Sequence, residues 1–74
     1  MELKPVEILE GVDLRAWALD SVNLERANLS GANLEGVCLS GANLKRVILR
    51  GALMDRAGLS GTNMEECTLS ELSL

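Results

Sequence analysis

The 74-residue sequence predicts an all-β solenoid, in which short extended segments wind around a core that the chain itself provides. Three features of the sequence predict this fold. An apolar residue stands at every fifth position, namely Leu9, Leu14, Leu19, Leu24, Leu29, Leu34, Leu39, Leu44, Leu49, Met54, Leu59, Met64, Leu69 and Leu74. Two positions earlier runs a mostly small or apolar series: Val12, Trp17, Val22, Ala27, Ala32, Val37, Ala42, Val47, Ala52, Ala57, Thr62, Cys67 and Leu72. Two positions after the leucine, glycine recurs at Gly11, Gly31, Gly36, Gly41, Gly51 and Gly61.

A period of five residues fits neither a straight helix nor a flat strand. In an α-helix, five residues turn the side chain through about 500°, so successive leucines would spiral around the helix. In a flat strand, an odd spacing places successive leucines on opposite faces, whereas residues two apart share a face. Both spacings are satisfied if each pentad is a short extended segment, with its small residue and its leucine inward, followed by a bend. The chain must then coil around its own core.

The amino-terminal residues 1–10 lack the repeat pattern and are expected to form a cap or an irregular first turn. Pro5 and Glu7 both oppose a regular inward series there. Trp17, the only aromatic residue, then occupies an inward position of the first coil. We expect its indole to pack near the open end and help seal it, and the alternative is a contact with a partner protein.

Corners of the coil are expected at the second residue after each leucine. Glycine adopts a left-handed turn conformation there without steric cost. The same register also holds residues with side chains: Ala16, Ser21, Arg26, Arg46, Arg56, Glu66 and Glu71. We therefore expect that a positive φ is not required at every corner and that more than one turn type occurs.

Three five-residue units in the same register resemble the repeat unit of a known family. Residues 27–31, 32–36 and 42–46 read ANLSG, ANLEG and ANLKR, which resemble the A(D/N)LXX unit of the pentapeptide-repeat family. The similarity covers residues 11–74. It implies a right-handed quadrilateral, or four-sided, parallel β-helix with four pentads per coil and therefore about three and a half coils.

Four pentads per coil place residues 20 apart in one column, at the strand spacing of roughly 4.8 Å. We expect Asn23, Asn43 and Asn63 to form a ladder of stacked amides. We also expect mixed-charge columns, in which each exposed pair contributes about 0 to 1 kcal/mol. These columns place Lys45 between Glu25 and Glu65, Arg26 and Arg46 beside Glu66, and Arg15 with Glu35 and Asp55.

The carboxyl-terminal repeats run to Leu74 without a capping segment, so this end is expected either to stack on something or to continue in a longer protein. Leu69, Leu72 and Leu74 are the candidate contacts, together with Trp17 in the first coil. A homodimer through this coil would bury both open ends.

The composition argues against an enzyme, a metal site or a cofactor. The chain has no histidine, which is the commonest general base and metal ligand. Cys67 is expected to be a buried structural thiol and Cys38 an exposed incidental one, on different columns and without a disulfide. Gly36 and Gly41 have phosphate-loop spacing but lack the lysine that must follow. Few cysteines and no apolar stretch of membrane-spanning length lead us to expect a soluble cytoplasmic protein.

Two functions are consistent with these features. The first is a non-catalytic structural or interaction module that presents its surface to a protein partner of unknown identity. The second is implied by the resemblance, since some members of the family are acidic DNA mimics that inhibit DNA gyrase. Residues 1–40, 41–60 and 61–74 carry net charges of -4, +3 and -3, so a basic middle interrupts the acidic track that mimicry requires. We therefore favour the interaction module and expect no direct binding of nucleic acid and no membrane partner.

Overall fold

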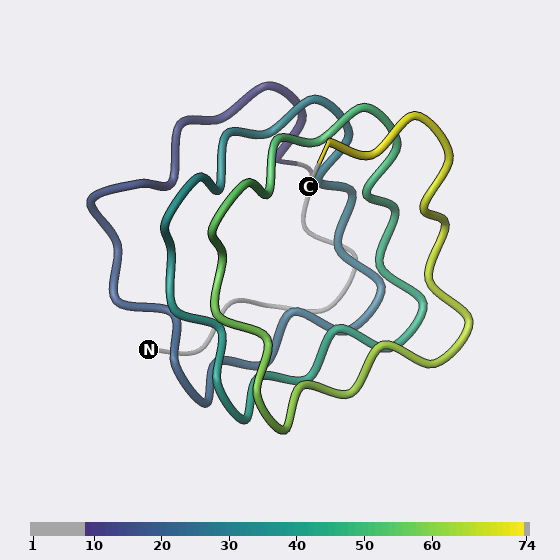
Figure 1. The fold of residues 1–74 in the computed structure, drawn as a ribbon. Helices are drawn as coiled ribbons and strands as arrows, with labels where there is room; N and C mark the ends of the chain where they lie inside the picture. Colours follow the sequence, from purple (N-terminus) through teal and green to yellow (C-terminus); the bar gives the residue numbers. More distant parts are fainter. Residues whose placement is uncertain (1–8, 74) are drawn as a thin grey trace.

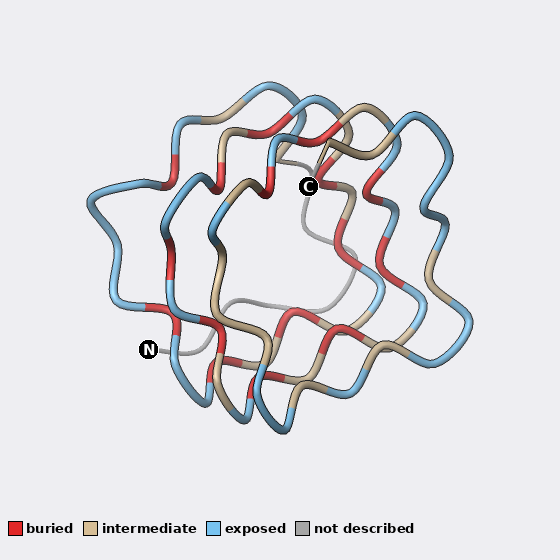
Figure 2. Cartoon of the chain, viewed as in Figure 1, coloured by how far each residue is buried: buried red, intermediate tan, exposed pale blue. Residues whose placement is uncertain are grey.

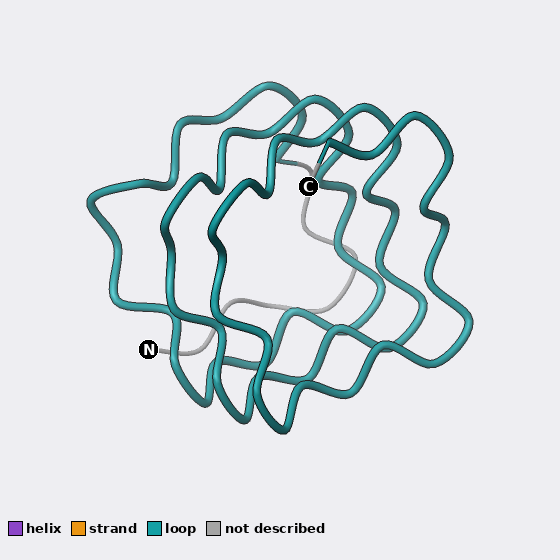
Figure 3. Cartoon of the chain, in the orientation of Figure 1, coloured by secondary structure: helices purple, strands orange, loops and turns teal. Residues whose placement is uncertain are grey.

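The computed structural model describes residues 9–73, which wind into stacked, four-sided coils (Figure 1). Every β-bridge is parallel and joins two residues 20 apart, from Asp13 with Asn33 to Leu53 with Ser73. Four pentads therefore make one turn of the chain. The described residues contain isolated bridges and turns but no helix and no extended strand (Figure 3). Among them there is also no helix of the length and apolarity that a membrane span needs.

The core lies inside the coils and is made by the two inward series (Figure 2). Every fifth-position residue from Leu14 to Met54 is at most 1% exposed. From Val22 to Ala52 the residue two positions earlier is also buried, and the largest exposed fraction in that series is 3%, at Val37. The predicted inward register is therefore confirmed. No charged or polar side chain among the described residues is buried with them.

Backbone hydrogen bonds join each coil to the next at a constant offset. The N–H of Leu34 donates to the C=O of Leu53 at 2.8 Å, and the N–H of Leu53 donates back to the C=O of Ala32 at 2.9 Å. The same pair of bonds recurs on nearly every side of every coil. Each side contributes only one bridged residue, and the chain changes direction at the corners between these short segments.

Each corner is a β-turn closed by a hydrogen bond to the leucine carbonyl, as from the N–H of Ala42 to the C=O of Leu39 at 2.9 Å. At twelve of the thirteen corners the second turn residue has a positive φ, as in a type II turn. Six of these residues are not glycine, and their φ angles range from 58° at Glu66 to 67° at Arg26. Our expectation that corners without glycine can form another turn was therefore wrong at these six corners and holds only at Ala16. Only the corner at Ala16 departs from the left-handed conformation.

The repeat begins no later than Leu9, whose N–H donates to the C=O of Asn28 at 2.8 Å. Glu10 and Gly11 form the first regular corner. Two residues of the expected irregular segment 1–10 thus already follow the repeat. The rest of that expected cap, residues 1–8, lies outside the described residues.

Candidate interaction surface

The first coil leaves the stack at one side. Between the buried Leu14 and Leu19, the exposed segment Arg15–Ala18 projects outward, at the left edge of Figures 1 and 2. The turn bond from the N–H of Trp17 to the C=O of Leu14 is kept, at 3.1 Å. The chain is thus anchored at both ends of the excursion and displaced between them.

The excursion breaks the hydrogen-bond pattern between the first and second coils. Three bonds that recur elsewhere do not form here: from the N–H of Ala16 to Glu35, from the N–H of Leu19 to Cys38, and from the N–H of Cys38 to Trp17. The β-bridge between Ala18 and Cys38 is absent as well. The interruption is confined to this one side, because the bonds resume at Ser21 and Leu24.

Trp17 is 39% exposed, so the predicted inward placement is wrong. The inward position accommodates alanine and valine elsewhere in the coils, and Val37 fills it directly above, on the second coil. An indole is much larger than either side chain, which explains why this segment swings out of the stack. The only aromatic side chain of the protein therefore projects from its surface.

The last described coil is less buried than the coils before it. Leu69 is 45% exposed, whereas Leu29 and Leu49, which precede it in the same column, are fully buried. Leu72 is half-buried and packs against the edge of the core. Leu74, the third predicted contact, lies outside the described residues. Trp17 and Leu69 lie in the first and last described coils, so they belong to two separate surfaces.

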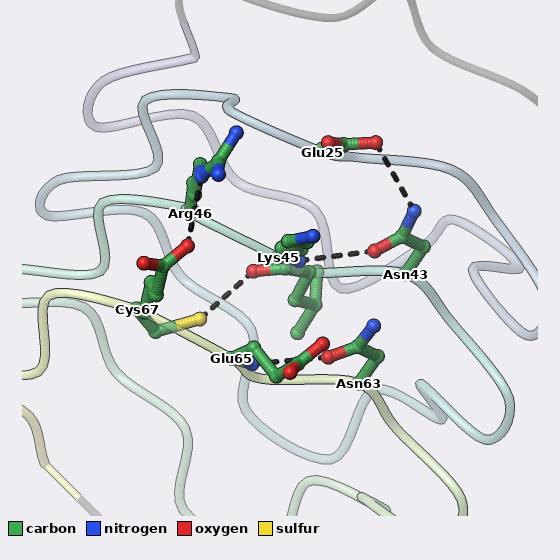
Figure 4. Close-up of polar contacts among 9 residues, drawn as sticks. Glu25, Asn43, Lys45, Arg46, Asn63, Glu65 and Cys67 are labelled. Atoms are coloured by element: carbon green, nitrogen blue, oxygen red, sulfur yellow. Dashed lines mark hydrogen bonds and ion pairs between the residues drawn. The ribbon is translucent and has the colours of Figure 1, made fainter.

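The column of Asn23, Asn43 and Asn63 is aligned by parallel bridges, but its amides do not form the predicted ladder. Each side-chain Oδ1 instead accepts the backbone N–H two residues later, at 3.1 Å for Asn43 and 3.0 Å for Asn63 (Figure 4). The local Asx turn therefore replaces amide stacking. The Nδ2 group of Asn43 donates at 3.4 Å to Glu25 in the coil below.

The predicted charge columns are formed in part. Arg46 pairs with Glu66 at 2.9 Å, as expected (Figure 4). Among the described residues, no ion pair joins Lys45 to Glu25 or to Glu65. The side chain of Lys45 is therefore not held by an ion pair with either glutamate.

Arg15 pairs with Asp13 on its own coil, at 2.8 Å, and not with Glu35 in its column as predicted. The two residues flank Leu14, so a neighbour two positions away is reached more readily than one in the next coil. Hydrogen bonds from the side chain and the backbone of Arg15 lower the pKa of Asp13 to about 2. A second pair that the columns did not predict joins Arg50 to Glu71 at 3.3 Å.

Both cysteines are free thiols; Cys38 is exposed as predicted, whereas Cys67, predicted to be buried, is only partly buried. Cys67 faces inward, donates its S–H to the C=O of Leu44 at 2.8 Å, and has a pKa raised by burial. Cys38 is exposed, and hydrogen bonding with Ser40, whose Oγ lies 3.3 Å from its Sγ, lowers its pKa. Among residues 9–73, neither thiol forms a hydrogen bond with an ionisable side chain that could act as its base.

Other surface features offer little chemistry. A hollow of about 320 Å³ lies at the corner formed by Arg15, Glu35, Gly36, Asp55 and Arg56. Its side chains are two guanidiniums and two carboxylates, with no nucleophile and no base to activate one. Within residues 9–73 no group of three or more Cys, Asp or Glu side chains is placed to hold a metal ion.

Sequence reasoning missed the excursion at Arg15–Ala18, although two signals marked it. Trp17 is by far the largest residue in the inward small series. Ala16 stands at the corner position two residues after Leu14, where every other corner has a glycine or a polar residue. These two neighbouring residues mark the pentad in which both the inward side-chain volume and the turn residue differ from the rest of the repeat.

Comparison with known proteins agrees with this geometry. The family model for pentapeptide repeats matches in eight copies, over residues 8–46 and 39–70. The crystal structure of alr5209, a pentapeptide repeat protein from Nostoc PCC 7120, is similar at 32% sequence identity and a TM-score of 0.75. That similarity covers 96% of this chain and 58% of alr5209.

The crystal structure of HetL, a pentapeptide repeat protein involved in heterocyst differentiation regulation from Nostoc sp. strain PCC 7120, is similar at 24% identity and a TM-score of 0.63. It matches over 96% of this chain and 48% of HetL, so this chain spans about half the length of these two structures. No curated protein matches the sequence. The period of five, the bridges between residues 20 apart and the family match together show that the chain belongs to the pentapeptide-repeat family.

Proposed function

We propose that this chain is a non-catalytic protein-interaction module that contacts a protein partner through Trp17 and the projecting segment Arg15–Ala18. The observation that carries the proposal is the 39% exposure of Trp17 at the one break in the repeat among residues 9–73. Tryptophan is the residue most enriched where interfaces concentrate their binding energy. An exposed indole on a rigid coil is therefore a suitable anchor.

The excursion also has an energetic cost, which a small residue in this position would avoid. Each net backbone hydrogen bond contributes about 0.5 to 1.5 kcal/mol, so the three missing bonds amount to about 1.5 to 4.5 kcal/mol. Departures of this size from an otherwise regular pattern occur mostly where function requires them. We infer that Trp17 is retained for binding and not for packing.

We infer that the solenoid is a right-handed, four-sided β-helix of about three and a half coils. In that arrangement the Trp17 side of the first coil is accessible from the flank, and the partner does not need to approach the stack from its end. The free thiols of Cys38 and Cys67 suit a reducing compartment such as the cytoplasm, which is where we place the interaction.

Three immobilised proteins test the proposal: the parent, Trp17→Ala, and Ile48→Ala as a matched control. Ile48 is 37% exposed, close to the exposure of Trp17, but lies on a regular side of the second coil, bridged to Asn28 and Thr68. A supporting result is a protein from the source cells that binds the parent and Ile48→Ala but not Trp17→Ala. Its purified form should also shift the fluorescence of Trp17, the only tryptophan. Equal capture by all three proteins, or an unchanged fluorescence spectrum, contradicts the proposal.

DNA mimicry, the alternative function, has less support. The longest dimension of the described residues is 24 Å, and the coil that carries Lys45, Arg46, Arg50 and Arg56 separates the acidic regions. A competitor of duplex DNA needs an uninterrupted acidic track. Inhibition of DNA gyrase by the purified chain, relieved by excess duplex, would favour mimicry over the interaction module.

A further inference from the structure

The side of the coil that carries Trp17 has an acidic character. This Trp17 side is defined here as residues 15–21 of the first coil and 35–41 of the second, and its charged residues are Arg15, Asp20 and Glu35. Asp13 holds Arg15, whose Nε lies 2.9 Å from Oδ1 and whose Nη2 lies 2.8 Å from Oδ2. Among residues 9–73, neither Asp20 nor Glu35 forms an ion pair. The charges left without a counterion on the Trp17 side are therefore two carboxylates.

These two exposed carboxylates lie at opposite ends of the Trp17 side. Asp20 belongs to the corner that follows Trp17 along the chain. Glu35 stands in the second coil above the corner that precedes Trp17, where it lines the hollow of about 320 Å³. Hydrogen bonding with Ser40 lowers the pKa of Cys38, on the same side, and the charge of Asp20 opposes this shift. Trp17 therefore lies on a surface with negative charge at both of its ends.

The other basic residues of the first two coils lie away from the Trp17 side. Arg26, Lys45 and Arg46 occupy the corner at residues 25–26 and 45–46, beyond the side formed by residues 22–24. In the third coil, Arg56 lines the same hollow as Glu35. A partner that approaches Trp17 on the first two coils therefore meets net negative charge.

We propose that the partner contacts Trp17 through a cationic segment, whose arginine or lysine lies over the indole and pairs with Glu35 or Asp20. This inference rests on the function proposed above, because it takes Trp17 as the contact. A cation within about 6 Å of the ring centre is attracted to the face of an indole, and tryptophan is the best aromatic residue for this contact. Carboxylates at both ends of the side raise the local concentration of a cationic partner and orient it. A neutral or acidic segment would gain neither effect.

The hollow favours an arginine over a lysine, and a single one. A guanidinium can donate two parallel hydrogen bonds to the carboxylate of Glu35, which an ammonium group cannot do. Asp55, the other carboxylate of the hollow, already accepts a hydrogen bond from Ser73, whose Oγ lies 2.8 Å from its Oδ1. Arg56 repels a second cation at this corner. We therefore expect one arginine opposite Glu35 and not a run of basic residues.

Contacts of this kind are individually weak. A cation over an exposed indole, or an exposed ion pair, changes the affinity by about 2- to 5-fold. A short peptide that supplies only these contacts should bind with a dissociation constant on the order of 10 mM. Because exposed charges are screened, the binding should weaken as the salt concentration rises.

Nuclear magnetic resonance of the isotope-labelled chain measures such weak binding and locates it. The probe is an acetylated and amidated pentapeptide with one arginine between two pairs of glycines, and its control carries glutamine in place of the arginine. The arginine peptide should shift the indole N–H signal of Trp17 and the amide signal of Glu35, and the glutamine peptide should not. Glu35→Gln and Asp20→Asn should each weaken the binding about 2- to 5-fold. Glu65→Gln removes an exposed carboxylate at another corner and should bind like the parent.

Several results would overturn the cationic segment. They are an indole signal that does not move up to about 50 mM arginine peptide, an equal movement with the glutamine peptide, and binding that neither Glu35→Gln nor Asp20→Asn weakens. Equal weakening by Glu65→Gln would also overturn it, because the peptide would then follow only the overall charge. Capture of a protein partner that depends on Trp17 would still stand after any of these failures. Equal capture by the parent, Trp17→Ala and Ile48→Ala would instead overturn the proposed function itself.

Discussion

Two glycine-to-alanine substitutions of opposite expected sign test whether the corners are held by backbone conformation. Gly51 has a φ of 69°, and a Cβ atom built on it meets nothing within 4 Å. Its substitution by alanine therefore adds no clash and isolates the cost of the left-handed conformation, about 1 to 2 kcal/mol. Loss of unfolded-state entropy returns about 0.4 to 1 kcal/mol, so we expect a net destabilisation of about 1 kcal/mol.

Gly58 is the matched control, since it lies mid-side and its φ is outside the left-handed region. A Cβ there would lie 3.8 Å from the Cα of Cys38 and 3.9 Å from its Sγ, which is ordinary van der Waals contact. Gly58→Ala should therefore stabilise the protein by about 0.4 to 1 kcal/mol, because only the unfolded chain loses freedom.

Urea unfolding followed by circular dichroism measures both effects. For a slope of about 1 kcal/mol per M, typical of a small domain, the midpoint should fall by about 1 M for Gly51→Ala and rise by about 0.5 M for Gly58→Ala. The slope itself should not change. Shifts of the same sign in both variants, or an unaltered midpoint for Gly51→Ala, would refute the link between positive φ and the corners.

Three further predictions concern individual side chains. Replacement of the fully buried Leu44 by alanine should lower the free energy of unfolding by about 3 to 5 kcal/mol, and replacement by lysine should abolish folding. A Leu44→Lys protein that is as stable as the parent in urea would contradict the inward register. The thiol of Cys38 should react with a disulfide reagent faster than that of Cys67, because hydrogen bonding lowers the pKa of Cys38 and burial raises that of Cys67. The two rates can be measured separately in Cys38→Ser and Cys67→Ser, and equal rates would contradict these environments. Asp13 should titrate in the folded protein near its pKa of about 2, so its contribution to stability, present at pH above 4, declines as the pH falls toward 2. Carbon-detected NMR measures this titration, and Arg15→Gln should return the midpoint toward the ordinary value near 3.9.

The inward register could be predicted from the sequence because it depends on one property, repeated many times. Each member of the series is large and apolar, and neither a straight helix nor a flat strand would place successive members on one face. The corners were predicted in position but not in conformation. Arg26 and Glu66 adopt a positive φ because the coil fixes where the chain must turn, and tertiary packing outweighs a local preference of about 1 to 2 kcal/mol.

The side-chain contacts were harder to predict because several partners compete for each group. Asn43 bonds its own turn, since an acceptor two residues away is already held in place, whereas a stacked amide must be ordered from another coil. Arg15 prefers Asp13 to Glu35 for the same reason. The excursion around Trp17 depends on the volume of an inward position, which a pattern of apolar and polar residues does not specify.

The constant offset of the hydrogen bonds between coils has a consequence for how the chain folds as it is made. Apart from the turn bonds, the backbone bonds join residues 19 or 21 positions apart, so one coil alone has nothing to pair with. Closing each 20-residue loop costs about 2.7 kcal/mol of chain entropy plus a constant, before any contact is gained. At a synthesis rate of about 5 to 20 residues per second, the first coil must wait about 1 to 4 s for the second. During that interval the leucines of a coil without a neighbour have no core to enter, so this is the stage of synthesis at which the repeats are most open to binding by a chaperone.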